Sequence, residues 1–130
     1  MNVREIFRLK GEEHFRALEF ALTKELSAAG QGGMVLSPGG GWITQQSSVE
    51  LLRSAGRIIY LRASPEAVAR RLMKVETRPL LAGRDPVVAL RELYRKRRTL
   101  YETADTVLDT EKLAPQQLIE KVVELASTIE

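Results

Sequence analysis

Three consecutive glycines are the first residues whose type and spacing could do chemistry. Gly39, Gly40 and Gly41 follow Pro38 and a short apolar segment. Glycine lets a backbone approach a ligand closely and leaves its N–H groups free to donate hydrogen bonds. The run therefore indicates a place where the backbone contacts a ligand, and the alternative is an ordinary turn.

Arg97 could bind an anion because of the helical face on which it falls. Leu93 lies four residues before it and Tyr101 four residues after it, so the three residues share one stripe of a predicted helix. A guanidinium on an apolar stripe is costly unless it meets an anionic partner. That partner is either the carboxylate of a ligand or a structural acid. A third interpretation is an arginine that reaches solvent from the edge of the stripe.

A second arginine, Arg16, has acids at helical spacing. Glu12 precedes it by four residues, Glu19 follows it by three, and Phe15 is its neighbour. Glu19 can pair with Arg16 and hold the guanidinium for a bidentate contact with an anion. A surface ion pair is the alternative interpretation.

The segment 75–86 carries a third arginine, Arg78, between two predicted helices. It also contains Pro79, Gly83 and Pro86. A cation in a segment rich in proline and glycine is typical of a lid that brings charge to a phosphate group. We expect this segment to be a lid and the most mobile internal part of the chain.

Other kinds of chemistry find little support. The sequence has no cysteine, which excludes disulfides, a thiolate nucleophile and Cys-ligated metals. His14, the one histidine, lies among charged residues, and we interpret it as a solvated helix position. The net charge of +3 and the pI of about 9.4 come from scattered cations rather than a basic face. We therefore expect a small anionic molecule as the partner and no nucleic acid.

Length and hydropathy set the class of protein. The 130 residues are 44% apolar and 28% charged, which suits one globular domain. No apolar run approaches the length of a membrane span, and the N-terminus has no apolar signal core. We expect a cytoplasmic protein without a membrane partner.

The elements that must position these residues follow from the sequence pattern. Apolar periodicity and capping residues predict helices over 3–9, 11–29, 46–54, 65–74, 86–103 and 115–129. Branched and apolar runs predict strands over 34–37, 57–61 and 106–108. Apolar strands that alternate with helices favour a single α/β domain over 1–130 with a parallel sheet. Ligands bind at the carboxyl ends of such strands, which is where the glycine run lies.

Taken together, these segments resemble the shikimate kinase family. The resemblance covers nearly the whole chain and rests on the order and spacing of the segments rather than on any one motif. The segments that carry it are Glu5-Ile6-Phe7, Gly11 to Glu19, Val35 to Gly41, Arg78 to Gly83, Arg97 with Leu100-Tyr101, and Ala104-Asp105 leading to Asp109-Thr110.

The resemblance implies a binding site for shikimate or a similar acid. The two arginines and the glycine backbone of this site would hold the carboxylate and hydroxyls of the acid. The glutamate would orient the arginine three residues before it, and the phenylalanines would wall the pocket. The residues concerned are Phe7, Phe15, Arg16, Glu19, Gly39, Gly40, Gly41 and Arg97.

The resemblance also implies ATP and Mg²⁺ as cofactors. Arg78 would be the catalytic lid arginine that reaches the transferred phosphoryl group of the nucleotide. Arg71 matches a position over adenine, and Ser37 matches a position near the magnesium ion without being a direct ligand. Leu113 stands where the family often has a polar or basic residue near adenine.

The sequence departs from the family at one large point. The family fold is P-loop kinase-like, a three-layer arrangement of a parallel sheet with flanking helices and strand order 2-3-1-4-5. It begins with a strand, a phosphate-binding loop, a helix and a second strand. No G-x-x-x-x-G-K-[ST] motif occurs in the 130 residues, so we expect the first two strands to be missing and the chain alone to be inactive.

Three interpretations of this departure stay open. The chain is a shikimate kinase whose sequence begins late, a non-catalytic or regulatory domain that binds a shikimate-like acid, or a structural relic. Strand 34–37 would lose both its neighbours and either pair with 57–61 or stay apart. We expect it to stay apart, with the glycine run facing Arg97 across the site and with self-association through the unpaired strand.

Overall fold

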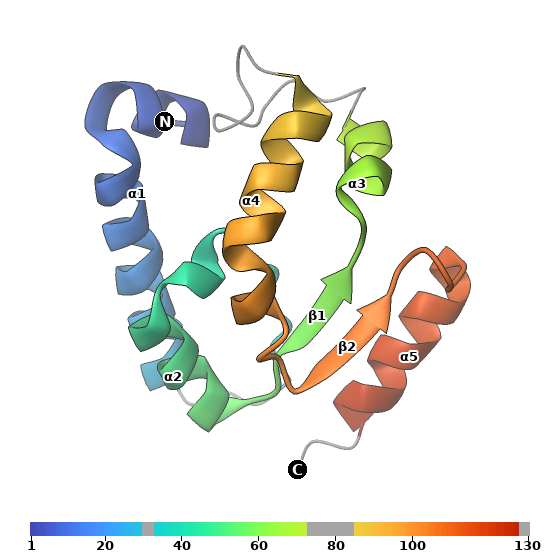
Figure 1. The fold of residues 1–130 in the computed structure, drawn as a ribbon. Coiled ribbons are helices and arrows are strands. Elements are labelled where there is room, and N and C mark those ends of the chain that lie inside the picture. The colour runs from blue at the N-terminus through green and yellow to red at the C-terminus, as the bar shows by residue number, and fades with distance from the viewer. Residues whose placement is uncertain (30–32, 73–84, 128–130) are drawn as a thin grey trace.

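The computed structural model describes residues 1–29, 33–72 and 85–127. Along the chain it has α1 (Val3–Ala28), the 3₁₀-helix η1 (Trp42–Thr44), α2 (Gln46–Ala55), β1 (Ile59–Arg62), α3 (Pro65–Leu72), α4 (Pro86–Tyr101), β2 (Thr106–Asp109) and α5 (Pro115–Ser127). From α2 onward each strand lies between helices along the chain, with α3 and α4 both between β1 and β2, and the helices surround a small sheet (Figure 1). This arrangement agrees with the predicted α/β class.

The sheet is a parallel pair of β1 and β2. Its register runs from Ile59 opposite Thr106 to Arg62 opposite Asp109, and α5 runs alongside β2 (Figure 1). Just before the strands pair, the Asp105 carboxylate accepts a hydrogen bond of 2.7 Å from the backbone N–H of Ile58. The predicted parallel pairing of strands 57–61 and 106–108 is confirmed, and the ends of these two strands differ from prediction by one or two residues.

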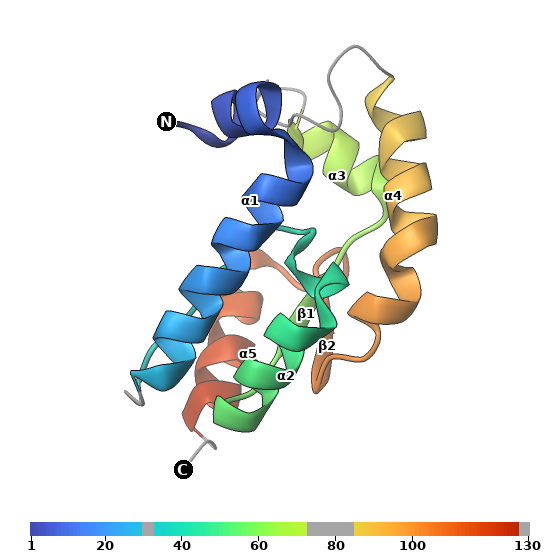
Figure 2. The ribbon, with the colours of Figure 1, turned by 90° about the vertical axis from the view of Figure 1, so that its left-hand side faces the viewer.

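Helix α1 is long and kinked, and it bends near its N-terminal end (Figure 2). It begins with a capping box, in which Asn2 accepts a hydrogen bond from the N–H of Glu5 and the Glu5 side chain accepts one from the N–H of Asn2. Gly11 interrupts it with φ 84° and ψ 167°, a conformation that is open essentially to glycine alone. The two predicted helices, 3–9 and 11–29, are therefore the two arms of α1.

The predicted strand 34–37 is wrong. The segment is not a strand in the structure, and the apolar side chain of Val35 is 83% exposed. An extended segment becomes a strand when a neighbour pairs with its N–H and C=O groups, and in the described residues the sheet contains β1 and β2 alone. No ladder joins 34–37 to 57–61, so the segment stays apart as we expected.

The core lies beneath the glycine run. Trp42, Ile43 and Val49 are buried, and the half-buried side chains of Leu52, Ile58, Leu100 and Tyr101 pack against them. The Trp42 indole donates a hydrogen bond of 3.0 Å to the hydroxyl of Thr23, which fixes η1 against α1. The core fixes the position of the glycine run, because η1 begins directly after Gly41.

The later helices begin as their sequences predict. The Ser64 hydroxyl accepts a hydrogen bond from the N–H of Ala67 at the start of α3, and the Asp85 carboxylate accepts bonds from the N–H groups of Val87 and Val88 at the start of α4. Most of the predicted lid, residues 75–84, lies outside the described residues.

In the part of the chain that the structure describes, the helices are all too short or too polar to span a membrane.

Candidate functional site

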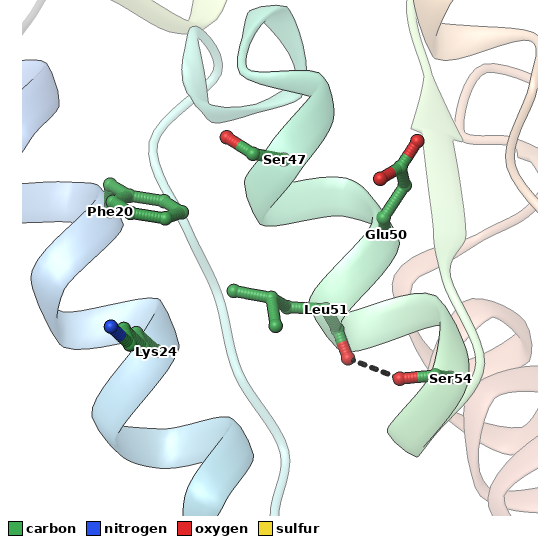
Figure 3. Close-up of a pocket in the computed structure, with 6 residues that line it drawn as sticks. All are labelled: Phe20, Lys24, Ser47, Glu50, Leu51 and Ser54. Atoms are coloured by element: carbon green, nitrogen blue, oxygen red, sulfur yellow. Dashed lines mark hydrogen bonds between the residues drawn. The ribbon is translucent and has the colours of Figure 1, made fainter.

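A cavity of ≈ 1320 Å³ opens between α1, the glycine segment, β1 and α4. Every residue predicted for the substrate site lines it except Glu19, which pairs with Arg16. A second, smaller pocket of ≈ 380 Å³ lies between α1 and α2 and is lined by Phe20, Lys24, Ser47, Glu50, Leu51 and Ser54 (Figure 3). It contains no residue that the sequence singled out, so the first cavity is the candidate site.

Arg16 is held on one wall of this cavity by carboxylates. Its guanidinium donates to Glu19 at 2.6 Å and to Glu12 at 3.2 Å, and it lies 5.3 Å from the centre of the Phe15 ring. The side chains of Arg16 and Glu19 are only 16% and 12% exposed. Phe7 packs against Phe15 with ring centres 5.1 Å apart. The predicted pairing of Arg16 with Glu19 is present, and it is half-buried rather than a surface pair.

The glycine run is packed tightly against this arginine. A Cβ atom at Gly41 would overlap the guanidinium of Arg16, and one at Gly39 would lie 3.5 Å from the Glu19 carboxylate. Gly41 is buried. A side chain at position 41 would displace the arginine, which explains in physical terms why a glycine stands there.

The middle glycine faces α4. A Cβ atom at Gly40 would lie 3.5 Å from the hydroxyl of Tyr101 and 4.0 Å from a terminal nitrogen of Arg97. The Tyr101 hydroxyl donates a hydrogen bond of 2.6 Å to the carbonyl of Gly40. The structure therefore brings together the glycine run, Arg16 and Arg97, as the sequence led us to expect.

Arg97 itself has no partner in the described part of the chain. Its side chain is half-buried and lines the cavity, yet neither a hydrogen bond nor an ion pair joins it to any described residue. The interpretation of Arg97 as one half of a structural ion pair therefore has no support in 1–29, 33–72 and 85–127. Such a guanidinium is a ready site for an anion.

The amides of the glycine run are also available. In the described residues, the N–H groups of Gly40 and Gly41 donate to no protein acceptor, whereas the next N–H, that of Trp42, bonds to the carbonyl of Gly39 at 3.0 Å. Two free amides beside two guanidiniums form a donor-rich wall. Oxygen atoms of a ligand, above all a carboxylate, fit such a wall.

Two residues of the site were missed by the sequence analysis. Tyr101 was assigned to the apolar stripe and to a segment that carries the resemblance but was given no role in the site, although its spacing of four from Arg97 places it on the same face. Gln45 donates a hydrogen bond of 3.4 Å to Glu19 and so supports the carboxylate that holds Arg16. Nothing in the sequence around Gln45 signals this contact.

Tyr60, on β1, stacks against the ring of Tyr101. The two rings are stacked with centres 5.0 Å apart and planes 25° apart. Burial raises the pKa of the Tyr60 phenol to about 12, and the nearby phenols of Tyr94 and Tyr101 add to the effect. Tyr60 therefore stays protonated throughout the physiological pH range.

Arg71, which was predicted to contact the nucleotide, lies toward the carboxyl ends of the strands. Arg71, at the end of α3, donates a hydrogen bond of 3.2 Å to the hydroxyl of Thr110, which follows β2. At the same edge Arg62 pairs with Asp109 at 3.3 Å. A hydrogen bond from the N–H of Glu111, together with Arg62, lowers the pKa of the Asp109 carboxyl. The predicted catalytic residue, Arg78, lies outside the described residues.

A metal ion has little to bind to in the described residues. Ser37 lines the cavity, but in this part of the chain no group of three His, Cys, Asp or Glu side chains is arranged to hold an ion. These residues do not fit a metal held by the protein alone, and we derive no step through one.

Comparison with known proteins decides the family. The sequence profile described as "Shikimate kinase" matches residues 1–127. The chain belongs to the shikimate kinase family. A shikimate kinase of Caldanaerobacter subterraneus is 38% identical over 123 residues, which are 95% of this chain and 71% of the relative. One of Cupriavidus pinatubonensis is 42% identical over 119 residues, which are 91% of this chain and 61% of the relative.

Solved shikimate kinases share the fold. The enzyme of Acinetobacter baumannii, solved in complex with shikimate, superposes with a TM-score of 0.86 at 32% identity and covers 99% of this chain and 73% of its own. The enzyme of Aquifex aeolicus gives a TM-score of 0.76 at 28% identity, covering 98% and 73%. This chain thus has the P-loop kinase fold and spans 61% to 73% of the length of these relatives.

Proposed function

We propose that this chain is the shikimate-binding portion of a shikimate kinase, which transfers a phosphoryl group from ATP to a hydroxyl of shikimate. The observation that carries the proposal is Arg97, a half-buried guanidinium without a described partner that lines the cavity beside the glycine run. Membership of the family supplies the substrate, because the relatives are named for shikimate and one of them is solved with it.

Each residue of the site then has a task that its contacts support. Arg97 and Arg16 bind the substrate carboxylate, and the free amides of Gly40 and Gly41 donate to its oxygens. Glu19 holds Arg16 in place through the 2.6 Å ion pair. Phe7 and Phe15 form an apolar wall that excludes water, which strengthens the charged contacts.

The phosphoryl-transfer half of the reaction rests on residues whose roles come from the family resemblance. By the family resemblance, Arg78 would contact the transferred phosphoryl group and Arg71 would contact the adenine ring. Mg²⁺ would be held largely by the phosphates of the nucleotide and by water, and the family resemblance would put Ser37 near it without making it a direct ligand. The reaction is governed by positioning and electrostatics, so these contacts matter only once the phosphates are held.

Transfer also needs a phosphate-binding segment, which we propose packs into the open side of the cavity against β1. The cavity of ≈ 1320 Å³ exceeds the range of about 300–1000 Å³ that is usual for a small-molecule site. In the described residues β1 pairs on one edge only, with β2. The Gly-Lys-Ser/Thr loop that would fill this role is not among the 130 residues.

Two further proposals concern the surroundings of the protein. We place it in the cytoplasm, where ATP is plentiful. The exposed apolar side chains of Met34, Val35 and Leu36 would promote self-association of the isolated chain, which sedimentation at rising concentration measures.

Binding of shikimate to this chain, measured by calorimetry, tests the proposed function. Arg97→Ala should weaken binding by about 1.5–3 kcal/mol, roughly ten- to a hundredfold, because a charge-assisted contact is lost. Arg95→Ala is the matched control, since it removes an exposed arginine from the same helix, and it should leave the affinity within about twofold. Equal affinities for the two variants would contradict the assignment of Arg97.

A non-catalytic module that binds a shikimate-like acid is the second candidate. The lack of a phosphate-binding motif in the 130 residues favours it. It shares the carboxylate site, so calorimetry with shikimate does not separate the two. Restoration of turnover by an added phosphate-binding segment does, since a module that has lost its catalytic geometry would not respond.

A further inference from the structure

Tyr101 makes the one described contact that ties the glycine run to α4 by a hydrogen bond. Its hydroxyl donates to the carbonyl of Gly40 at 2.6 Å, a short distance for such a bond. Arg97, four residues earlier, lies on the same face of α4. The glycine backbone and the anion-binding guanidinium are therefore fixed relative to each other through one helix face.

This bond also sets the direction of an amide. The carbonyl of Gly40 and the N–H of Gly41 belong to one peptide unit, which is planar and trans. They point in opposite directions, so a carbonyl turned to Tyr101 aims the Gly41 N–H away from it. That N–H has no protein acceptor in the described residues and belongs to a buried glycine in the wall of the cavity.

The tyrosine that holds the peptide is itself held on two sides. Its ring stacks on Tyr60 of β1 with centres 5.0 Å apart. It also packs against the core cluster of Trp42, Ile43 and Val49. A ring fixed by a strand and by the core can hold a peptide plane in one orientation at little further entropic cost.

We propose that Tyr101 is a positioning residue of the substrate site: its hydroxyl orients the Gly40–Gly41 peptide so that the Gly41 amide donates to the bound acid beside Arg97. The proposal rests on the proposed function, because it concerns the same ligand. It assigns Tyr101 no contact with the reacting atoms. The effect on the ligand passes through the backbone.

Tyr101→Phe tests this role, because phenylalanine keeps the stacked ring and the core packing and loses the hydroxyl alone. Tyr94→Phe is the matched control: it removes a hydroxyl from the same helix that makes no hydrogen bond to any described residue. In isotope-labelled, ligand-free protein, the amide resonances of Gly40 and Gly41 should move in Tyr101→Phe far more than in Tyr94→Phe. Unchanged resonances would mean that the hydroxyl does not orient the peptide, and the proposal would be overturned.

Calorimetry with shikimate completes the test. Tyr101→Phe should bind about three- to tenfold more weakly than Tyr94→Phe, the range that one net hydrogen bond supplies, and the two variants should melt within a degree or so of each other. At saturating shikimate, the Gly41 amide should shift less in Tyr101→Phe than in the wild-type chain. If the wild type binds and the two variants bind equally, the positioning role alone is overturned. A wild-type chain that binds no shikimate overturns the proposed function and this role together.

Discussion

At the scale of single residues, the site depends on glycines that leave room for charged groups. Gly41 is the clearest case, since the guanidinium of Arg16 occupies the space that a side chain would need. The guanidinium of Arg16 donates hydrogen bonds to the carboxylates of Glu19 and Glu12, which limit its movement. The identity of one small residue thus fixes the position of a large cation.

Gly41→Ala should therefore damage binding more than folding. The new methyl group would push Arg16 from its place beside Glu19, and we expect shikimate affinity to fall about tenfold or more, as for the loss of a charge-assisted contact. Gly56→Ala is the control, because its Cβ would meet only the carbonyl of Leu52 at an ordinary 3.9 Å. Calorimetry on both variants decides, and an unchanged affinity in Gly41→Ala would show that Arg16 moves aside freely.

The sequence predicted contacts within one helix better than contacts between distant segments. Arg16 with Glu19 could be paired from helical spacing alone, because both lie on one helix. The contact of Tyr101 with Gly40 joins positions 61 residues apart, and no local pattern encodes it. Gln45 is similar, since its contact with Glu19 exists only once α1 and η1 have packed. Tertiary contacts of polar groups are where the sequence analysis failed.

At the scale of elements, local signals decided which predictions held. Proline and serine or aspartate caps located α3 and α4, because those residues satisfy the free N–H groups of a helix end without help from elsewhere. Segment 34–37 has strand-like residues but pairs with no other described segment, and it is not a strand. A strand is a property of two segments, whereas a capped helix is largely a property of one.

The kink in α1 leads to a prediction about stability. Gly11 adopts φ 84° and ψ 167° with nothing within 4 Å of a Cβ built on it, so an alanine there would suffer backbone strain and no clash. Gly11→Ala should lower the free energy of unfolding by about 1–3 kcal/mol. Chemical denaturation measures this, with Gly56→Ala again as control, whose backbone is extended at φ −171°. A Gly11→Ala variant as stable as that control would mean that the kink relaxes into a continuous helix.

At the scale of the whole molecule, the fold presents a substrate wall facing an open side. The arginines and glycines gather on α1, α4 and the segment before η1, while the edge of β1 away from β2 pairs with no described strand. In the function that we propose, the nucleotide phosphates would bind on that side. The residues proposed to bind the substrate would then be separate from the segment that binds the phosphates.

We expect this chain by itself to show no phosphorylation of shikimate in a coupled assay with ATP and Mg²⁺. The phosphates would have nothing to hold them, and positioning supplies most of the catalysis. Turnover of about 1–100 per second, the usual range for kinases, would contradict this expectation.

A chimera sharpens that experiment. Joining the first strand, phosphate-binding loop, helix and second strand of the Caldanaerobacter relative in front of Met1 should produce turnover, because the first of these strands can pair with the free edge of β1. The same chimera with the loop lysine changed to alanine is the control and should remain inactive. A well-folded chimera without activity would favour the non-catalytic module.

The burial of Trp42 has a practical consequence for all of these experiments. It is the only tryptophan in the chain, it follows Gly41 directly, and its indole is bonded to Thr23, one turn beyond Glu19 on α1. An indole fixed in this way is a fluorophore built into the wall of the site. Its emission should change when the glycine run closes on an acid, and should change in a different way when η1 leaves α1 on unfolding. Occupancy and integrity of the site can therefore be followed optically in the same cuvette, without any added label.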